Sequence, residues 1–135
     1  MNEVSIMQAW VQGCLDAYDS GTVNLEVCDG IPGNWTLYYF GTREIKRSQA
    51  LRGGALVRYR CHYQLKTVAK AVGFARSMQA QLEALQEMGN GPQFTELPGG
   101  QVTVEGLRRA KVNKDGTCDY VMDLFGEYDR YYPGE

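Results

Sequence analysis

A single histidine limits the chemistry open to this sequence of 135 residues. Nucleophilic catalysis by Ser or Cys normally needs a neighbouring base, and His62 is the only imidazole in the chain. It lies between Arg60 and Gln64 in an alternating run, where nearby positive charge disfavours its protonated form. We therefore interpret His62 as an ordinary strand residue.

Carboxylate pairs, thiol clusters and phosphate-binding loops are the other candidates for chemistry. Asp119 and Asp123 lie four residues apart in an expected strand, a separation of about 13 Å that is too long for an acid–base pair. The glycines at 30, 33, 53 and 54 lack the frame of a phosphate-binding loop. The cysteines form no C-x-x-C pair that would suggest zinc; they are Cys14, Cys28, Cys61 and Cys118. We predict no enzymatic activity, no metal and no cofactor.

Length and composition predict one globular domain over residues 1–135. The chain is 44% hydrophobic and 22% charged, which is enough to build a core without disulfides. Residues 1–10 lack the basic start and apolar run of a signal peptide, and no stretch approaches the roughly 18 apolar residues of a membrane helix. We expect a cytosolic protein with reduced, mostly buried cysteines and no membrane partner.

Charge is unevenly distributed although its net value is only −2. Residues 1–41 hold five acids and no Lys or Arg, residues 42–70 hold eight basic residues and one acid, and residues 115–135 hold six acids and one Arg. Three explanations remain open: pairing across neighbouring strands, complementary patches between subunits, or a nucleic-acid site. The acidic pI of about 5.4 and the lack of a binding motif count against nucleic acid.

Two segments show helical periodicity. In Glu3–Tyr18 apolar residues recur at helical spacing, and Ser20-Gly21 follows them. The second helix is expected from Thr67 to about Gly89, before the breakers Gly91-Pro92. Each helix offers one apolar stripe that must be buried.

The remaining segments predict strands. Short strands are expected at Val23–Val27 and Trp35–Thr42, separated by the turn-forming residues 29–34. From Ala55 to Lys66 the apolar residues alternate with polar ones, which is the clearest strand pattern in the chain. Residues 43–54 are interpreted as a strand extension or a mobile arm. A hairpin joins 102–112 to 117–128 through Asp115-Gly116, and residues 129–135 form a short tail. The predicted fold is α+β, a mostly antiparallel sheet with two main helices on one face.

Two local patterns resemble a known family. The stretch Gly-Gly-x-x-Val-Arg-Tyr at 53–59 opens a long alternating strand that leads into a helix, and the chain ends in a pair of strands closing on Tyr131-Tyr132. Together with the order of elements along nearly all 135 residues, this resembles the tail-terminator and minor capsid proteins of the head–tail joining modules of long-tailed phages.

The resemblance implies a structural protein of the virion tail or neck, assembled in the cytoplasm of the bacterial host. It implies a ring, usually of six subunits, that caps the tail tube, ends its polymerisation and docks to the head connector. Its partners would be other copies of itself, the tail tube protein and the head-completion protein, with DNA only passing through the ring. As a hypothesis, the basic residues of one subunit face the acidic strand of the next; the interface residues are Arg52, Arg58, Arg60, Asp119, Asp123, Glu127, Tyr131 and Tyr132.

Two alternatives stay open. The chain could be another head–tail connector of the same module, a stopper or an adaptor. It could also be a nucleic-acid-binding module that uses the basic sheet face, with bases stacking on strand aromatics beside arginines. Those aromatics are Tyr38, Phe40, Tyr59 and Tyr63, of which Tyr59 and Tyr63 are expected to pack in the core.

Overall fold

The computed structural model describes residues 3–18, 21–49, 53–87, 91–95, 97 and 100–134. Two helices and five strands follow one another along the chain. They are α1 (Glu3–Tyr18), β1 (Val23–Leu25), β2 (Trp35–Gln49), β3 (Ala55–Ala69), α2 (Val72–Glu87), β4 (Gln101–Val112) and β5 (Cys118–Tyr132).

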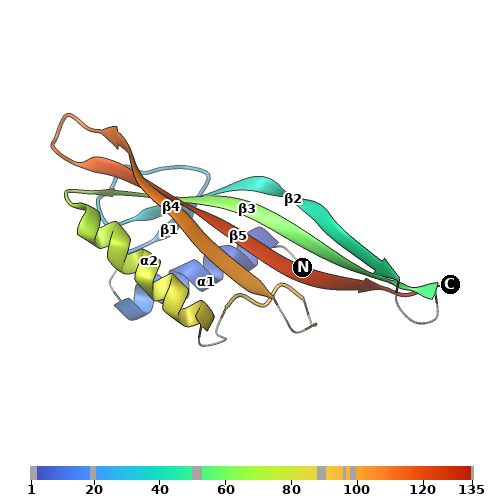
Figure 1. Cartoon of the computed structure of the whole chain (residues 1–135). Coiled ribbons are helices and arrows are strands. Elements are labelled where there is room, and N and C mark those ends of the chain that lie inside the picture. The colour runs from blue at the N-terminus through green and yellow to red at the C-terminus, as the bar shows by residue number, and fades with distance from the viewer. Residues whose placement is uncertain are drawn as a thin grey trace.

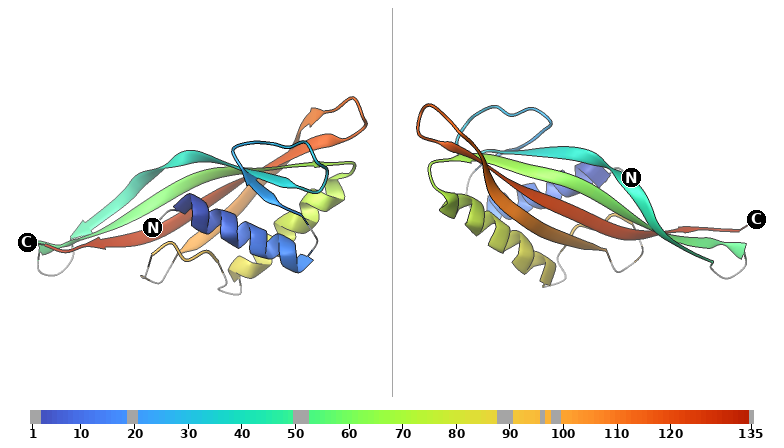
Figure 2. Two further views of the ribbon diagram at one scale, coloured as in Figure 1. Left: turned by 180° about the vertical axis from the view of Figure 1, so that it is seen from behind. Right: turned by 45° about the horizontal axis from the view of Figure 1, so that its top comes forward.

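The five strands form one sheet in the order β1-β2-β3-β5-β4. The short β1 runs parallel to β2, and every other pairing is antiparallel. Both helices lie on the same side of the sheet (Figures 1 and 2). This confirms the predicted α+β fold with a mostly antiparallel sheet and two helices on one face.

The core lies between that face and the helices. The helical stripes are buried as the periodicity predicts, through Met7, Val11, Cys14 and Leu15 of α1 and Ala75, Met78 and Leu82 of α2. They pack on inward-facing strand residues, among them Trp35, Leu37, Tyr63, Leu65, Met122 and Leu124. Each fully buried side chain of this size contributes about 1.5–3 kcal/mol, so packing of this layer decides where the elements lie.

The second helix begins five residues later than predicted. Residues Thr67–Ala69 continue β3, where they pair with Cys118–Tyr120 of β5. Thr67, Val68 and Ala69 are buried, and the Thr67 hydroxyl donates a hydrogen bond to the carbonyl of Asn34 at 3.0 Å. Pairing with a long neighbouring strand therefore outweighs the local preference for helix in this segment.

The first strand is shorter than predicted because the backbone turns at Glu26. This residue has φ = 62°, a left-handed conformation that ends an extended segment. Its backbone N–H still donates to the carbonyl of Leu37, while Val27 lies beyond the strand and is exposed. The strand thus spans Val23–Leu25 and not Val23–Val27.

Strands β2 and β5 are both longer than the sequence predicts. Residues 43–49, left open as an extension or an arm, form the second half of β2, while 50–52 lie outside the described residues. Residues 129–132, expected as a tail, are the last part of β5. We call the part of the sheet made by residues 43–49, 55–59 and 127–132 the wing; it extends beyond both helices (Figures 1 and 2).

A close approach at Gly126 fixes the base of the wing. A Cβ at this position would lie 2.8 Å from the sulfur of Cys61 and 2.8 Å from the ring of Phe94. Phe94 in turn stacks on Tyr128, with ring centroids 5.1 Å apart. Only glycine allows the loop that carries Phe94 to pack directly on β5.

Candidate interaction surface

His62 lies on the face of the sheet opposite the helices, which we call the open face. Its Nε2 atom is 3.0 Å from Oδ1 of Asp123, and its ring stacks on Phe125 with centroids 4.4 Å apart. Neither contact places a Ser or Cys nucleophile beside the imidazole. Within the described ranges, no group of three or more His, Cys, Asp or Glu side chains could hold a metal ion.

The two aspartates of β5 each have a separate set of partners. Asp119 Oδ2 is 3.1 Å from the ammonium of Lys66, and its Oδ1 accepts a hydrogen bond from Asn113 at 3.0 Å. Burial alone raises the pKa of Asp119, but these two donors outweigh it and hold the pKa below its ordinary value. The same balance lowers the pKa of Asp123, where His62 and Arg108 supply the opposing contacts.

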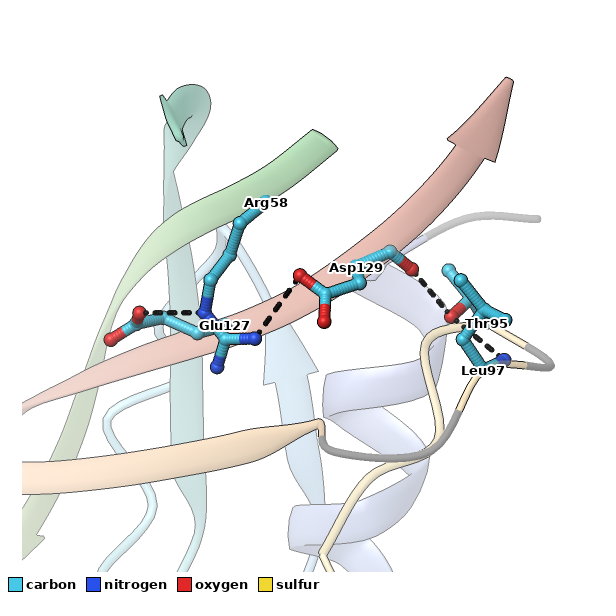
Figure 3. Close-up of polar contacts among 5 residues, drawn as sticks. All are labelled: Arg58, Thr95, Leu97, Glu127 and Asp129. Atoms are coloured by element: carbon cyan, nitrogen blue, oxygen red, sulfur yellow. Dashed lines mark hydrogen bonds and ion pairs between the residues drawn. The ribbon is translucent and has the colours of Figure 1, made fainter. Parts of the chain in front are cut away.

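Arg58 is held between two carboxylates of the adjacent strand. Its Nε donates to Glu127 at 3.3 Å and its Nη1 donates to Asp129 at 3.2 Å (Figure 3). The backbone carbonyl of Asp129 accepts a hydrogen bond from the hydroxyl of Thr95 at 2.8 Å, and that hydroxyl accepts one from the N–H of Leu97. Hydrogen bonds therefore connect the strand that carries these ion pairs to the loop beside the base of the wing.

These contacts bear on the hypothesis that Arg58 of one subunit faces the acidic strand of the next. In the single chain, Arg58, Asp119, Asp123 and Glu127 all have partners. Pairing across neighbouring strands, one of the three explanations of the charge distribution, is what the structure shows. Among the described residues Arg60 forms no ion pair; it lies over the ring of Phe125, with its guanidinium carbon 4.2 Å from the ring centroid. Arg52 lies outside the described residues.

The aromatic residues divide between core and surface. Tyr63 is fully buried, and Tyr59 stacks on Tyr128 while its hydroxyl contacts that of Tyr132 at 2.5 Å. Packing of Tyr59 and Tyr63 with the core is confirmed. Phe40, in contrast, is 58% exposed on the open face.

The wing carries exposed apolar side chains. Ile45, Leu56, Tyr131 and Tyr132 are each 37–44% exposed, and they make up half of the exposed large hydrophobic residues in the described part of the chain. Leu56 and Tyr131 face each other directly across β3 and β5. The predicted site included the two tyrosines but missed Ile45 and Leu56; the signal for Leu56 is an apolar residue on the polar side of an alternating strand.

A large hollow lies where the wing meets the body. It measures about 710 Å³ and is lined by Ile6, Gln93, Phe94, Thr95, Leu97, Arg130 and Tyr131. Its walls are mostly apolar, with one guanidinium, so it offers no set of polar groups that converge on a reacting atom. The hollow extends the apolar surface of Tyr131 towards α1.

The outer edge of β2 is protected against pairing with another strand. Within the described residues, β1 pairs with β2 only as far as Leu37, so the edge beyond it has no neighbouring strand. Bulges between Tyr39 and Gly41 and between Glu44 and Lys46 interrupt this edge of β2. The same part of the strand carries exposed basic side chains. Bulges and lysines are the usual protection of an exposed edge, so we expect the wing to bind through side chains and not by strand addition.

No protein-family model matches the sequence, and a search of curated proteins returns no relative. None of the helices in the described part of the chain is long and apolar enough to cross a membrane.

Proposed function

We propose that this chain is a structural assembly protein that binds other protein subunits through its wing. The single observation that carries the proposal is the wing itself, three strands that extend past both helices and expose Ile45, Leu56, Tyr131 and Tyr132. Neither helix covers the end of the wing (Figures 1 and 2), and a sheet of few strands gains stability from packing against a further layer. Partner surfaces on both faces of the wing would bury these side chains and stabilise it.

Among assembly proteins, we propose a ring at the end of a phage tail tube, in the tail or neck of the virion. The wing and the helix-covered body are different surfaces, so a contact between them is head-to-tail, and such contacts close into rings when the rotation permits. The resemblance of the sequence to tail-terminator proteins supports this choice, as does the elongated form of the sheet (Figure 1). In this role the ring ends polymerisation of the tube and provides the surface for the head connector.

The first test is the state of association of a variant with a polar wing. Replacing both Leu56 and Tyr131 by Ser removes an exposed apolar pair without opening the core. Size-exclusion chromatography with light scattering should show a ring for the wild type and a monomer for this variant. Val112→Ser is the matched control, because Val112 is 61% exposed but lies at the far end of β4.

The second test is functional. Added to purified tail tube protein during polymerisation, the wild type should shorten the tubes and remain bound at one end in electron micrographs. The wing variant should leave tube length unchanged. A wild-type chain that stays monomeric and does not affect the tubes would refute the proposal.

A further inference from the structure

A second surface on the open face has the chemistry of a binding site. We call it the arginine–aromatic hollow; it measures about 350 Å³ and is lined by Phe40, Gly41, Thr42, Arg43, Arg60, His62 and Phe125. It lies on the open face next to the base of the wing and draws its residues from β2, β3 and β5. Arg43 is the one lining residue that also belongs to the wing, and none of the four exposed apolar residues of the proposed assembly surface lines the hollow.

The aromatic rings that line the hollow contact one another and Arg60. Phe125 contacts both Arg60, at 4.2 Å from guanidinium carbon to ring centroid, and His62, at 4.4 Å between centroids. The ring of Phe40 is tilted against that of His62, with centroids 5.1 Å apart, and Phe40 remains 58% exposed. The bulge before Gly41, whose φ is 113°, turns the backbone so that Phe40 projects beside the hollow.

Two cations of the hollow lack acidic partners. Arg43 and Arg60 are direct neighbours across β2 and β3, an arrangement of like charges that destabilises a sheet. Within the described residues neither forms an ion pair, and the Nε of Arg60 is buried without a hydrogen-bond acceptor. A buried donor without an acceptor is costly. An anion bound between the two guanidinium groups would relieve the repulsion and supply the acceptor.

The neighbouring cations do not share this property. Arg58, Lys66 and Arg108 are each neutralised by a carboxylate of β5. The free positive charge of this part of the open face is therefore concentrated at Arg43 and Arg60. A site with two planar guanidinium forks beside exposed aromatic surface suits a carboxylate next to an apolar or aromatic group.

Nucleic acid fits the hollow less well than an acidic protein segment does. Two free cations would release few counterions from a phosphate backbone, which gives weak binding at physiological salt. A strand of nucleic acid that followed the open face would also meet the carboxylates of β5, which are Asp119, Asp123, Glu127 and Asp129. A protein segment can instead present one or two carboxylates at the hollow alone.

We propose that the arginine–aromatic hollow binds an acidic segment of a partner protein. An Asp or Glu carboxylate lies between Arg43 and Arg60, and an adjacent aromatic or apolar side chain packs on Phe40. Arg with aromatic residues is the composition that dominates binding energy at protein interfaces. The inference rests on the proposed function, because it assigns to an assembly protein a second docking surface and the chemistry of the segment bound there.

The test is a titration of the deuterated full-length chain followed by TROSY NMR. The probes are a blocked aspartyl-phenylalanyl-glutamate peptide, its counterpart with lysines in place of both acids, and a short thymidine oligonucleotide. The acidic peptide should cause saturable shifts at millimolar concentration in the amides of Gly41 and Thr42 and in the Nε–H of Arg60. The lysine peptide should cause none.

Variants locate the binding. Arg43→Gln should weaken binding of the acidic peptide at least tenfold, and because Arg43 is exposed this variant should keep the fold. Arg60→Gln should have the same effect. Lys46→Gln, another exposed cation of β2 that lies outside the hollow, is the control and should bind as the wild type does.

The proposal is overturned if the acidic peptide causes no saturable shift at the hollow, if the lysine peptide binds equally, or if the oligonucleotide binds more tightly than the peptide. The state of association of each variant is measured separately by light scattering. An intact ring that does not bind the peptide refutes the hollow alone. A monomer that binds the peptide refutes the ring alone.

Discussion

Replacing Arg58 by Met tests whether the charges of the sheet act within one chain or between subunits. Arg58 contacts Glu127 at 3.3 Å and Asp129 at 3.2 Å, and all three side chains are only 21–24% exposed. Methionine keeps most of the apolar length of the side chain and removes its charge. The two carboxylates, two residues apart on one strand face, then repel each other.

The expected loss follows from this partial burial. An exposed ion pair contributes about 0.2–1 kcal/mol, and removing one member of a buried pair costs about 3–5 kcal/mol. Two half-buried contacts lie between these limits and near the lower one, so we expect a loss of about 1–2 kcal/mol in the free energy of unfolding. For a chain of this length that lowers Tm by roughly 3–8 °C.

Thermal unfolding at one fixed protein concentration measures the effect, since assembly would itself raise the apparent stability. Arg47→Met is the matched control, because Arg47 pairs with Glu44 in the same wing while both side chains are 41–57% exposed. Its loss should stay within about 0.5 kcal/mol. Adding Glu127→Gln and Asp129→Asn to Arg58→Met should recover part of the stability, because no uncompensated charge remains.

A different outcome would support the hypothesis that Arg58 contacts a neighbouring subunit. If Arg58→Met unfolds at the temperature of the wild type but no longer assembles, Arg58 pairs with a neighbouring subunit and the contacts within the chain are incidental. A fall in stability with unchanged assembly supports pairing within the chain.

Three further outcomes can be checked on the purified protein. Gly126→Ala should cost about 1–3 kcal/mol in urea unfolding because its Cβ has no space, whereas Gly13→Ala, exposed inside α1 with nothing within 4 Å, should stabilise by about 0.5–1 kcal/mol. The lowered pKa of Asp119 gives stability that is fully present above its unfolded value, near 3.9, and is lost as the pH falls through the folded value; Asp119→Asn should therefore lose less stability than the wild type between pH 5 and pH 3. A thiol reagent should modify one cysteine in the native protein, Cys28, and all four after unfolding, because the other three are buried.

Much of the fold was predictable because its signals are local. Alternation from Ala55 to Lys66 requires a strand with one buried face, and the buried residues Val57, Cys61, Tyr63 and Leu65 confirm that face. Asp115-Gly116 correctly marks the turn between β4 and β5. Helical periodicity likewise identified the buried stripe of α1.

The errors concern properties that depend on distant residues. The segment Thr67–Ala69 has no local feature that requires a strand, and its conformation is decided by pairing with Cys118–Tyr120, about fifty residues later in the chain. The strand register is equally invisible in the sequence, yet it determines that Arg58 faces Asp129. Segregated charge could therefore be recognised from the sequence, while its partners could not.

The strand register also bears on why Arg60 forms no ion pair within the described residues. Glu127 lies directly opposite Arg60 across β3 and β5, but Glu127 and Asp129 both pair with Arg58. Arg60 instead lies over the ring of Phe125, the residue opposite His62, while Arg43 is the neighbour of Arg60 on β2. Substituting Phe125 by Glu would place a carboxylate beside Arg60 and should neutralise the hollow. If the hollow binds a carboxylate, that single change should abolish binding of the acidic peptide and raise the stability of the isolated chain, two effects that no purely structural role of Phe125 would produce together.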